Sequence, residues 1–169
     1  MNGDHVADFY ERHPYPPPVE DLSQYQNEWG DGTRRRADHH LLWPELPYRD
    51  DHWILVAGCG TSQAAKYAVR YPHAQIVGID VSATSIEHTQ LLIERHAITN
   101  LELRQLPIER VGELDRAFDQ VVCTGVLHHL ADPGEALNAL AGALAPGGAL
   151  VAMVYAPYGR TGVYMIQDY

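Results

Sequence analysis

The sequence is poor in cysteine and in basic residues, and both shortages exclude classes of protein. Two cysteines, Cys59 and Cys123, are too few for a disulfide framework. Twelve Lys and Arg against 22 Asp and Glu leave a formal charge of -10, which opposes binding to the phosphate backbone of DNA or RNA. We therefore expect free thiols in a reducing compartment and no nucleic-acid partner.

Long hydrophobic runs are also missing. No stretch approaches the roughly 18 apolar residues that span a bilayer, and the first residues, MNGDHVADFYERHPY, lack the charged and apolar regions of a signal peptide. These absences predict a cytoplasmic protein with no membrane association. Ten histidines are present, but the pairs His39-His40 and His128-His129 are adjacent, and no Cys or His spacing follows a zinc pattern, so no metal site is predicted.

What the chain does have is enough apolar sequence for one core. Its 169 residues, 46% of them hydrophobic, suit a single domain. Residues 1–50 differ in composition, because they hold HPYPPP, scattered aromatics and an expected helix at 33–43 with the run Arg34-Arg35-Arg36. We interpret residues 1–50 as a helical, proline-rich N-terminal cap on a domain formed by residues 51–169.

From Trp53 onward, apolar strands alternate with glycine or polar turns and helices. Asp132 can cap a helix that has Pro133 at its first position and Glu135 in a capping box. This alternation predicts an α/β fold, layered around a mainly parallel sheet. The expected strands are 53–57, 75–79, 101–104, 120–123 and 149–155, and the expected helices are 62–70, 84–96, a short turn at 126–130, and 133–144.

A glycine turn and an acidic residue suggest a nucleotide site. Gly58-Cys59-Gly60 closes the first strand, where backbone amides and a helix start can approach a ligand closely. Asp80 ends the next strand, about twenty residues on, where a carboxylate can bind both hydroxyls of a ribose. The third position of the dinucleotide pattern holds Gln63 instead of glycine. Both a dinucleotide and S-adenosylmethionine fit these residues, and a helix-capping role for Asp80 is the structural alternative.

Further segments carry a resemblance to a known family. The segments FDQVVCTGVLHHLADP and LAPGGALVAMVY, together with ILVAGCGTS and GIDVS, resemble the strand blocks of class I S-adenosylmethionine-dependent methyltransferases in order and spacing. The resemblance covers residues 53–155. It implies a Rossmann-like three-layer sandwich, S-adenosylmethionine as cofactor and S-adenosylhomocysteine as product.

The resemblance also implies the cofactor-binding residues. The glycine loop, Gly58-Cys59-Gly60, would face the amino acid end of the cofactor. Asp80 would bind the ribose, and Val81 would lie against the adenine. Thr124 and Gly125 would border the sulfonium. The family often has an Asp after the third strand for the adenine amino group, but Pro107 stands there. We therefore expect backbone groups near Leu106 and Ile108, or Glu109, to hold adenine. The implied set is Gly58, Cys59, Gly60, Thr61, Asp80, Val81, Leu106, Pro107, Ile108, Thr124 and Gly125.

Residues for catalysis and for the methyl acceptor are less defined. His128 and His129 stand where the family commonly has two polar residues after the fourth strand, and either a base or a packing role fits them. Cys59 and Cys123 have no identifiable base, which favours packing. The cap and the strand ends supply the acceptor-side candidates Tyr10, His13, Tyr15, Tyr155, Tyr158 and Arg160.

The acceptor is expected to be a small molecule. Related enzymes that methylate planar amides and bases use an Asn/Asp-Pro-Pro-Tyr turn, and this chain has CTGV there. The competing functions are a non-catalytic S-adenosylmethionine-binding module and a fragment of an NAD-dependent oxidoreductase. For the segment PYPPP alone, a proline-rich ligand for a partner's aromatic groove is the alternative.

Only five strands are expected, whereas the family sheet has two more beside the fifth. The apolar fifth strand would then have an unpaired edge, which favours pairing with another chain. We expect either a missing C-terminal segment of a longer methyltransferase or a partner, such as a second copy in a homo-oligomer, to cover that edge.

Overall fold

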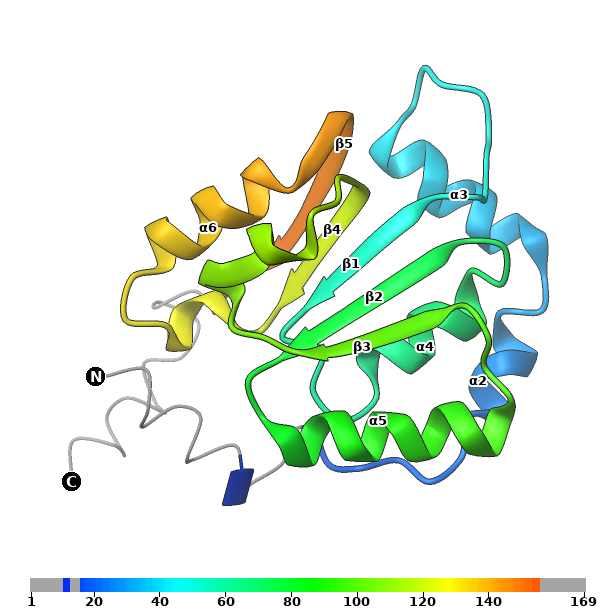
Figure 1. The fold of residues 1–169 in the computed structure, drawn as a ribbon. Coiled ribbons are helices and arrows are strands. Elements are labelled where there is room, and N and C mark those ends of the chain that lie inside the picture. The colour runs from blue at the N-terminus through cyan, green and yellow to red at the C-terminus, as the bar shows by residue number, and fades with distance from the viewer. Residues whose placement is uncertain (1–10, 13–15, 156–169) are drawn as a thin grey trace.

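Residues 11–12 and 16–155 are described by the computed structural model, in which a five-stranded parallel sheet lies between two layers of helices (Figure 1). The strand order is β3-β2-β1-β4-β5, and every pairing in it is parallel. This confirms the predicted Rossmann-like α/β class. The strands are β1 Trp53–Ala57, β2 Gln75–Asp80, β3 Leu101–Gln105, β4 Phe118–Thr124 and β5 Leu144–Met153.

The helices form the two outer layers. Helices α4 and α5 cover one face of the sheet, and α6 with the short helix η1 covers the other (Figure 1). Asp132 caps α6 as predicted, because its carboxylate accepts from the Glu135 N–H. The helices are α2 Ser23–Glu28, α3 Gly32–Leu42, α4 Gln63–Arg70, α5 Ala83–His96 and α6 Pro133–Gly142, with 3-10 turns η1 Ile108–Leu114 and η2 Leu127–His129.

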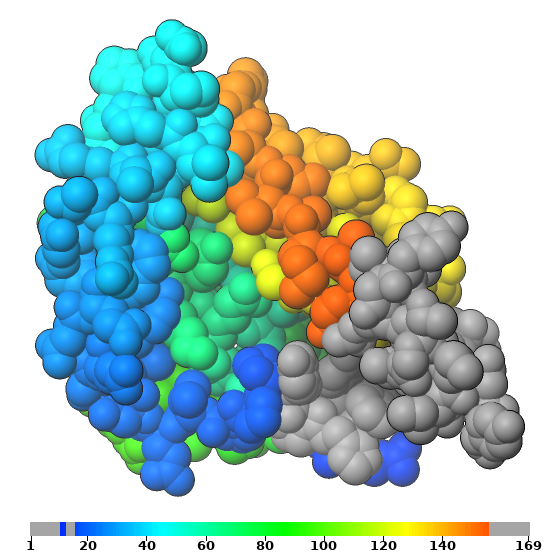
Figure 2. All heavy atoms as spheres, turned by 180° about the vertical axis from the view of Figure 1, so that it is seen from behind, coloured from blue at the N-terminus to red at the C-terminus, as the bar shows by residue number. Residues whose placement is uncertain are grey.

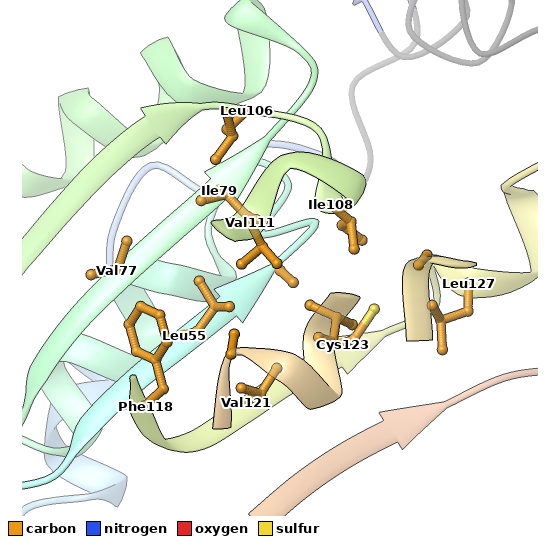
Figure 3. Close-up of a cluster of buried hydrophobic side chains, with 14 residues drawn as sticks. Leu55, Val77, Ile79, Leu106, Ile108, Val111, Phe118, Val121, Cys123 and Leu127 are labelled. Carbon is orange, nitrogen blue, oxygen red and sulfur yellow. The ribbon is translucent and has the colours of Figure 1, made fainter. Parts of the chain in front are cut away.

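Alternation along β1 divides the core between the two faces. Leu55 packs with Phe118 and Val121 on the side of α6 and η1 (Figure 3). Ile54 and Val56 point the other way, into the cluster beneath α4. Successive side chains of a strand alternate between faces, so a strand that is apolar throughout is buried on both. The continuous run WILVA is thus explained by its central place in the sheet.

The end of α6 and the start of β5 differ from the prediction. The helix ends at Gly142 instead of residue 144, and β5 begins at Leu144, which pairs with Phe118. The register then shifts before Gln120 pairs with Ala149, and Gly147 has φ +77° within this irregularity. The PGG segment therefore forms a bulge inside the strand, because glycine tolerates the positive φ that the bulge requires.

Helix α3 was expected within residues 1–50, the segment that we interpret as a cap; α2 was not. Asp31 caps α3 through the Thr33 N–H, and the helix begins at Gly32, one residue before the predicted start. The Trp43 indole Nε1 donates to the Gly147 carbonyl at 2.9 Å, which joins the cap to the bulge of β5. Figure 2 shows this cyan end of the cap against the orange start of β5. Figure 1 shows α3 beside the amino ends of the strands, opposite the edge where ligands bind in such sheets.

Candidate cofactor and acceptor site

The carboxyl ends of β1, β2 and β4 border a cavity. It encloses about 770 Å³ including its open mouth. Such a cavity lies where parallel sheets bind their ligands. The lining residues are Pro16, Gly58, Gly60, Gln63, Asp80, Val81, Ser85, Leu106, Ile108, Glu109, Thr124, Gly125, Val126, His129 and Leu130.

The glycine loop fits closely against the end of β4. Gly58 and Gly60 have φ values of +68° and +53°, and the Gly58 N–H donates to the Ile79 carbonyl at 2.9 Å. A Cβ atom at Gly58 would lie 2.4 Å from Cγ2 of Val126. Only glycine combines this backbone conformation with so little space. The absence of side chains here lets a ligand reach the backbone of the loop.

Asp80 joins the glycine loop to the start of α5. Its Oδ2 accepts from the Gly60 N–H at 2.8 Å, and its Oδ1 accepts from the Ser82 N–H at 3.0 Å. Burial raises the pKa of the Asp80 carboxyl above its ordinary value, although both hydrogen bonds oppose that shift. Through these two hydrogen bonds, Asp80 holds the glycine loop and the start of α5 together at the cavity. Each carboxylate oxygen has further lone pairs for a ligand hydroxyl.

The segment after β3 was predicted to hold adenine through Leu106, Pro107 and Ile108, but only part of it lines the cavity. Leu106 and Ile108 line the cavity, and the Leu106 N–H is bonded to the Asp80 carbonyl at 2.9 Å. Pro107 precedes η1 and is absent from the lining, whereas the exposed Glu109 is part of it. Together with Asp80, Glu109 brings a carboxylate to this cavity.

Cys59, within the glycine loop, and Thr61, directly after it, have buried side chains that do not reach the cavity. Both are 0% exposed, and neither lines the cavity. Burial raises the pKa of the Cys59 thiol well above its ordinary value, and that of Cys123 to about 11, so both thiols stay protonated at neutral pH. The Thr61 hydroxyl donates to the Pro16 carbonyl at 2.7 Å. These two residues shape the loop from within the fold.

The turn after β4 forms the far end of the cavity. Thr124 and Gly125 line it, and Gly125 is held by its N–H bond to the Met153 carbonyl at 3.0 Å. His129 lines the cavity as well. The His128 ring lies between its neighbours, with its centroid 4.1 Å from His129 and 4.2 Å from Tyr155. The two histidines thus separate into a cavity residue and a packing residue.

Several acceptor-side candidates are not among the described residues, and some residues that line the cavity were not predicted. Tyr10, His13, Tyr15, Tyr158 and Arg160 lie outside the described residues. Val126 and Leu130 belong to the VLHHL segment that carried the resemblance, so their position was a usable signal. Gln63 was noted only for not being glycine, and it lines the cavity from the first position of α4. The residues missed by sequence reasoning are Pro16, Gln63, Ser85, Val126 and Leu130.

Among residues 11–12 and 16–155, no three His, Cys, Asp or Glu side chains are grouped so that they could hold a metal ion. No helix in this part of the chain is long and apolar enough to cross a membrane.

Comparison with known families identifies the fold's relatives. A family model described as a methyltransferase domain matches residues 55–150, more than half of the chain. The chain belongs to this methyltransferase domain family. The match spans the glycine loop, Asp80 and the turn after β4. The predicted membership in the class I S-adenosylmethionine-dependent methyltransferases is thereby confirmed.

Individual relatives of this methyltransferase domain differ in what their names say they act on. An uncharacterised protein of Synechococcus sp. is 35% identical over 96% of this chain and 39% of its own length. A ubiquinone biosynthesis O-methyltransferase of Acinetobacter baylyi is 27% identical over 71% of this chain and 53% of its own length. A tRNA U34 carboxymethyltransferase of Methylococcus capsulatus is 32% identical over 68% and 36%. The chain therefore spans between 36% and 53% of these relatives.

A solved structure extends the comparison to the cofactor. PKMT2 from Rickettsia typhi, in complex with AdoHcy, superposes with a TM-score of 0.63 at 28% identity, over 72% of this chain and 24% of that one. The methyltransferase family uses S-adenosylmethionine, and the cavity described above fits it. The two side-chain-free positions in the glycine loop admit a ligand to the backbone, and the Asp80 carboxylate offers acceptors for hydroxyl groups.

Proposed function

We propose that this chain transfers a methyl group from S-adenosylmethionine to a small-molecule acceptor. The observation that carries the proposal is the joining of three elements at one cavity. Asp80 hydrogen-bonds the glycine loop, the same loop packs on Val126, and the turn after β4 closes the far end. A ligand with an adenosine end and a reactive sulfonium end matches these three parts.

Each part of the cofactor has residues suited to it. The backbone of Gly58 and Gly60 would bind the amino acid end, and Asp80 the ribose hydroxyls. Val81, Leu106 and Ile108 would lie against adenine, with the Glu109 carboxylate available to its amino group. Thr124 and Gly125 would border the sulfonium. In this proposal Cys59, Thr61 and Pro107 support the loops without contacting the cofactor.

Catalysis would depend mainly on alignment. When bound, the cofactor would supply a methyl group that passes to the acceptor's nucleophilic atom as the carbon–sulfur bond breaks and S-adenosylhomocysteine leaves. The apolar side chains of Val126 and Leu130 would orient the acceptor and exclude water. His129 lines this end of the cavity and would accept a proton from an acceptor that loses one. His128 would support His129 through ring packing.

The charges around the cavity favour a small molecule over RNA. Among the described residues, those that line the cavity include Asp80 and Glu109 but no Lys or Arg. The basic run on α3 lies beside the amino ends of the strands, away from this cavity (Figure 1). Within it, Arg35 donates to the Trp29 carbonyl at 2.6 Å, and the Arg36 guanidinium lies 4.3 Å from the Tyr48 ring centroid. RNA binding would require cations for phosphates near the mouth. An uncharged or cationic small acceptor needs no such cations at the mouth of the cavity.

Cofactor binding is tested by calorimetric titration with S-adenosylhomocysteine. We expect binding by the intact chain, with an affinity at least about tenfold lower in Asp80→Ala, because a charged acceptor for two hydroxyls is lost. Glu87→Ala changes an exposed carboxylate on α5 and serves as the control. Binding of NADH without binding of S-adenosylhomocysteine would overturn the proposal in favour of an oxidoreductase.

The acceptor class needs a separate experiment. The chain is incubated with S-adenosylmethionine carrying a labelled methyl group and with cell extract divided into small molecules, RNA and protein. Label in the small-molecule fraction, lost with Asp80→Ala, is the expected result. Enzymatic label in the RNA fraction would contradict the small-molecule proposal while leaving methyl transfer intact. Cofactor binding without transfer to any fraction would favour a non-catalytic module.

A further inference from the structure

The described residues ahead of α2 follow helix α5 closely. We call residues 11–12 and 16–22 the lead clasp. The Glu20 carbonyl accepts from the Arg95 guanidinium, and the Leu22 N–H donates to His96 Nε2 at 3.0 Å. Leu22 is 1% exposed and packs with Leu92. Figure 1 shows the blue trace running along α5 toward α2. These contacts fix the clasp at the C-terminal end of α5.

At the other end of α5, Glu11 supplies acceptors that the helix itself lacks. Its carboxylate accepts from the Ala83 N–H at 2.6 Å, the Thr84 N–H at 3.1 Å and the Thr84 hydroxyl at 2.5 Å. The hydrogen bond from the Thr84 hydroxyl lowers the pKa of Glu11, so the group is a carboxylate at neutral pH. The first N–H groups of a helix have no partner within it. Glu11 provides that partner from a distant part of the chain.

The remaining N–H groups of this turn are also satisfied. The Ser82 N–H is bonded to Asp80, and the Ser82 hydroxyl accepts from the Ser85 N–H at 3.1 Å. Asp80, Ser82 and Glu11 therefore form one continuous set of acceptors around residues 82–85. Two members of the turn, Val81 and Ser85, line the cavity together with Asp80. A change in the backbone at Ala83 and Thr84 would move this wall.

We infer that Glu11 is a positioning residue for the cofactor, which it serves by holding the turn between β2 and α5 in place. The inference rests on the proposed function. The clasp has other anchors, since Pro16 is bonded to Thr61 and lines the cavity itself. Loss of the Glu11 carboxylate therefore leaves the clasp attached at Thr61, Arg95 and His96. It leaves the N–H groups of Ala83 and Thr84 without their acceptor.

The test compares variants by titration with S-adenosylhomocysteine and by thermal unfolding. Glu11→Ala is expected to bind about tenfold more weakly, a typical effect of removing a charged hydrogen-bond acceptor. Glu20→Ala removes an exposed carboxylate from the same clasp and should bind as the wild type does. Thr84→Val keeps both backbone bonds and removes only the hydroxyl, so it should weaken binding and lower the unfolding midpoint less than Glu11→Ala does.

A double-mutant cycle separates positioning from general stabilisation. If Glu11 acts through the turn, Thr84→Val should have little further effect on affinity in the Glu11→Ala background. Equal effects of Thr84→Val in both backgrounds would overturn the inference, even if Glu11→Ala also lowered the unfolding midpoint. Weaker binding in Asp80→Ala but unchanged binding in Glu11→Ala would overturn the role of Glu11 alone. Unchanged binding in both would overturn the proposed function.

Discussion

Glycine is required at position 58 for two separate reasons, one of backbone conformation and one of space. Its φ of +68° is costly for other residues, and the space beside it is filled by Val126. Both constraints come from the approach of the glycine loop to the end of β4. The pattern Gly-x-Gly therefore reports local crowding as well as access for a ligand. Sequence reasoning identified the ligand side of this position but not the packing side.

Replacing Gly58 by Ala tests both constraints together. We expect the free energy of unfolding to fall by about 1–3 kcal/mol from backbone strain, with weaker binding of S-adenosylhomocysteine because the loop must shift away from Val126. Gly142→Ala is the matched control: it lies at the end of α6 with no atom within 4 Å of the added Cβ, so it should be neutral or slightly stabilising. Urea denaturation and calorimetry measure the two effects. If Gly58→Ala had the stability and the affinity of the wild type, the loop could accommodate a Cβ atom without strain, which would contradict this prediction.

Elements are predictable from sequence to the degree that their contacts are local. The strand β1 was placed to the residue, because its apolar run and the glycine turn that ends it are adjacent in the chain. The β5 bulge was missed, since it depends on how residues 144–149 meet β4. The contact of Glu11 with Ala83 joins residues 72 apart, and nothing near either residue indicates it. Whether Glu109 lines the cavity also could not be decided from the sequence, because it depends on how the chain enters η1.

The attachment of α3 to the sheet should depend on pH. His52 is 7% exposed and stacks on Trp43, with ring centroids 4.8 Å apart and planes at 5°. Burial, and then the charge of Arg49, lowers the pKa of His52 below 6.5. Between that lower pKa and 6.5 the unfolded chain binds more protons than the folded chain. The free energy of unfolding therefore falls as pH is lowered through this window.

The variant His52→Phe keeps an aromatic ring against Trp43 and removes the titrating group. We expect its free energy of unfolding to change less than that of the wild type when the pH is lowered below 6.5. His73→Phe, at an exposed histidine, should leave the wild-type pH dependence in place. Chemical denaturation at several pH values measures the slopes. Equal slopes for wild type and His52→Phe would assign the pH dependence to other groups.

At the scale of the whole molecule, two clusters of buried side chains hold the sheet between its helices. The larger cluster joins β1, β2 and β4 to α6 and η1 (Figure 3). Sequence patterns predicted this layered arrangement because parallel strands that are buried on both faces are apolar throughout. They left the cap less defined, since α2 is short and has no buried residue of its own.

Phe118 is the largest fully buried side chain in the part of the chain that the structure describes. Phe118→Ala should lower the free energy of unfolding by about 3–5 kcal/mol through lost burial and the cavity that remains. Leu91→Ala, at a side chain that is 58% exposed on α5, should change it by less than about 0.5 kcal/mol. Urea denaturation with an unchanged m-value measures the difference. A small effect of Phe118→Ala would mean that this part of the core can collapse around the gap.

The strand order has a consequence for how the chain folds. The central strand β1 pairs on one side with β4, so Ile54 and Gln120 are paired across a stretch of chain that contains two strands, two α-helices and η1. Parallel pairing requires such long crossovers, and each must be closed before its hydrogen bonds form. Topologies dominated by distant pairings fold in about milliseconds to seconds instead of microseconds. We therefore expect the chain to reach the arrangement that places the glycine loop beside the end of β4 more slowly than a helical bundle of the same length would fold.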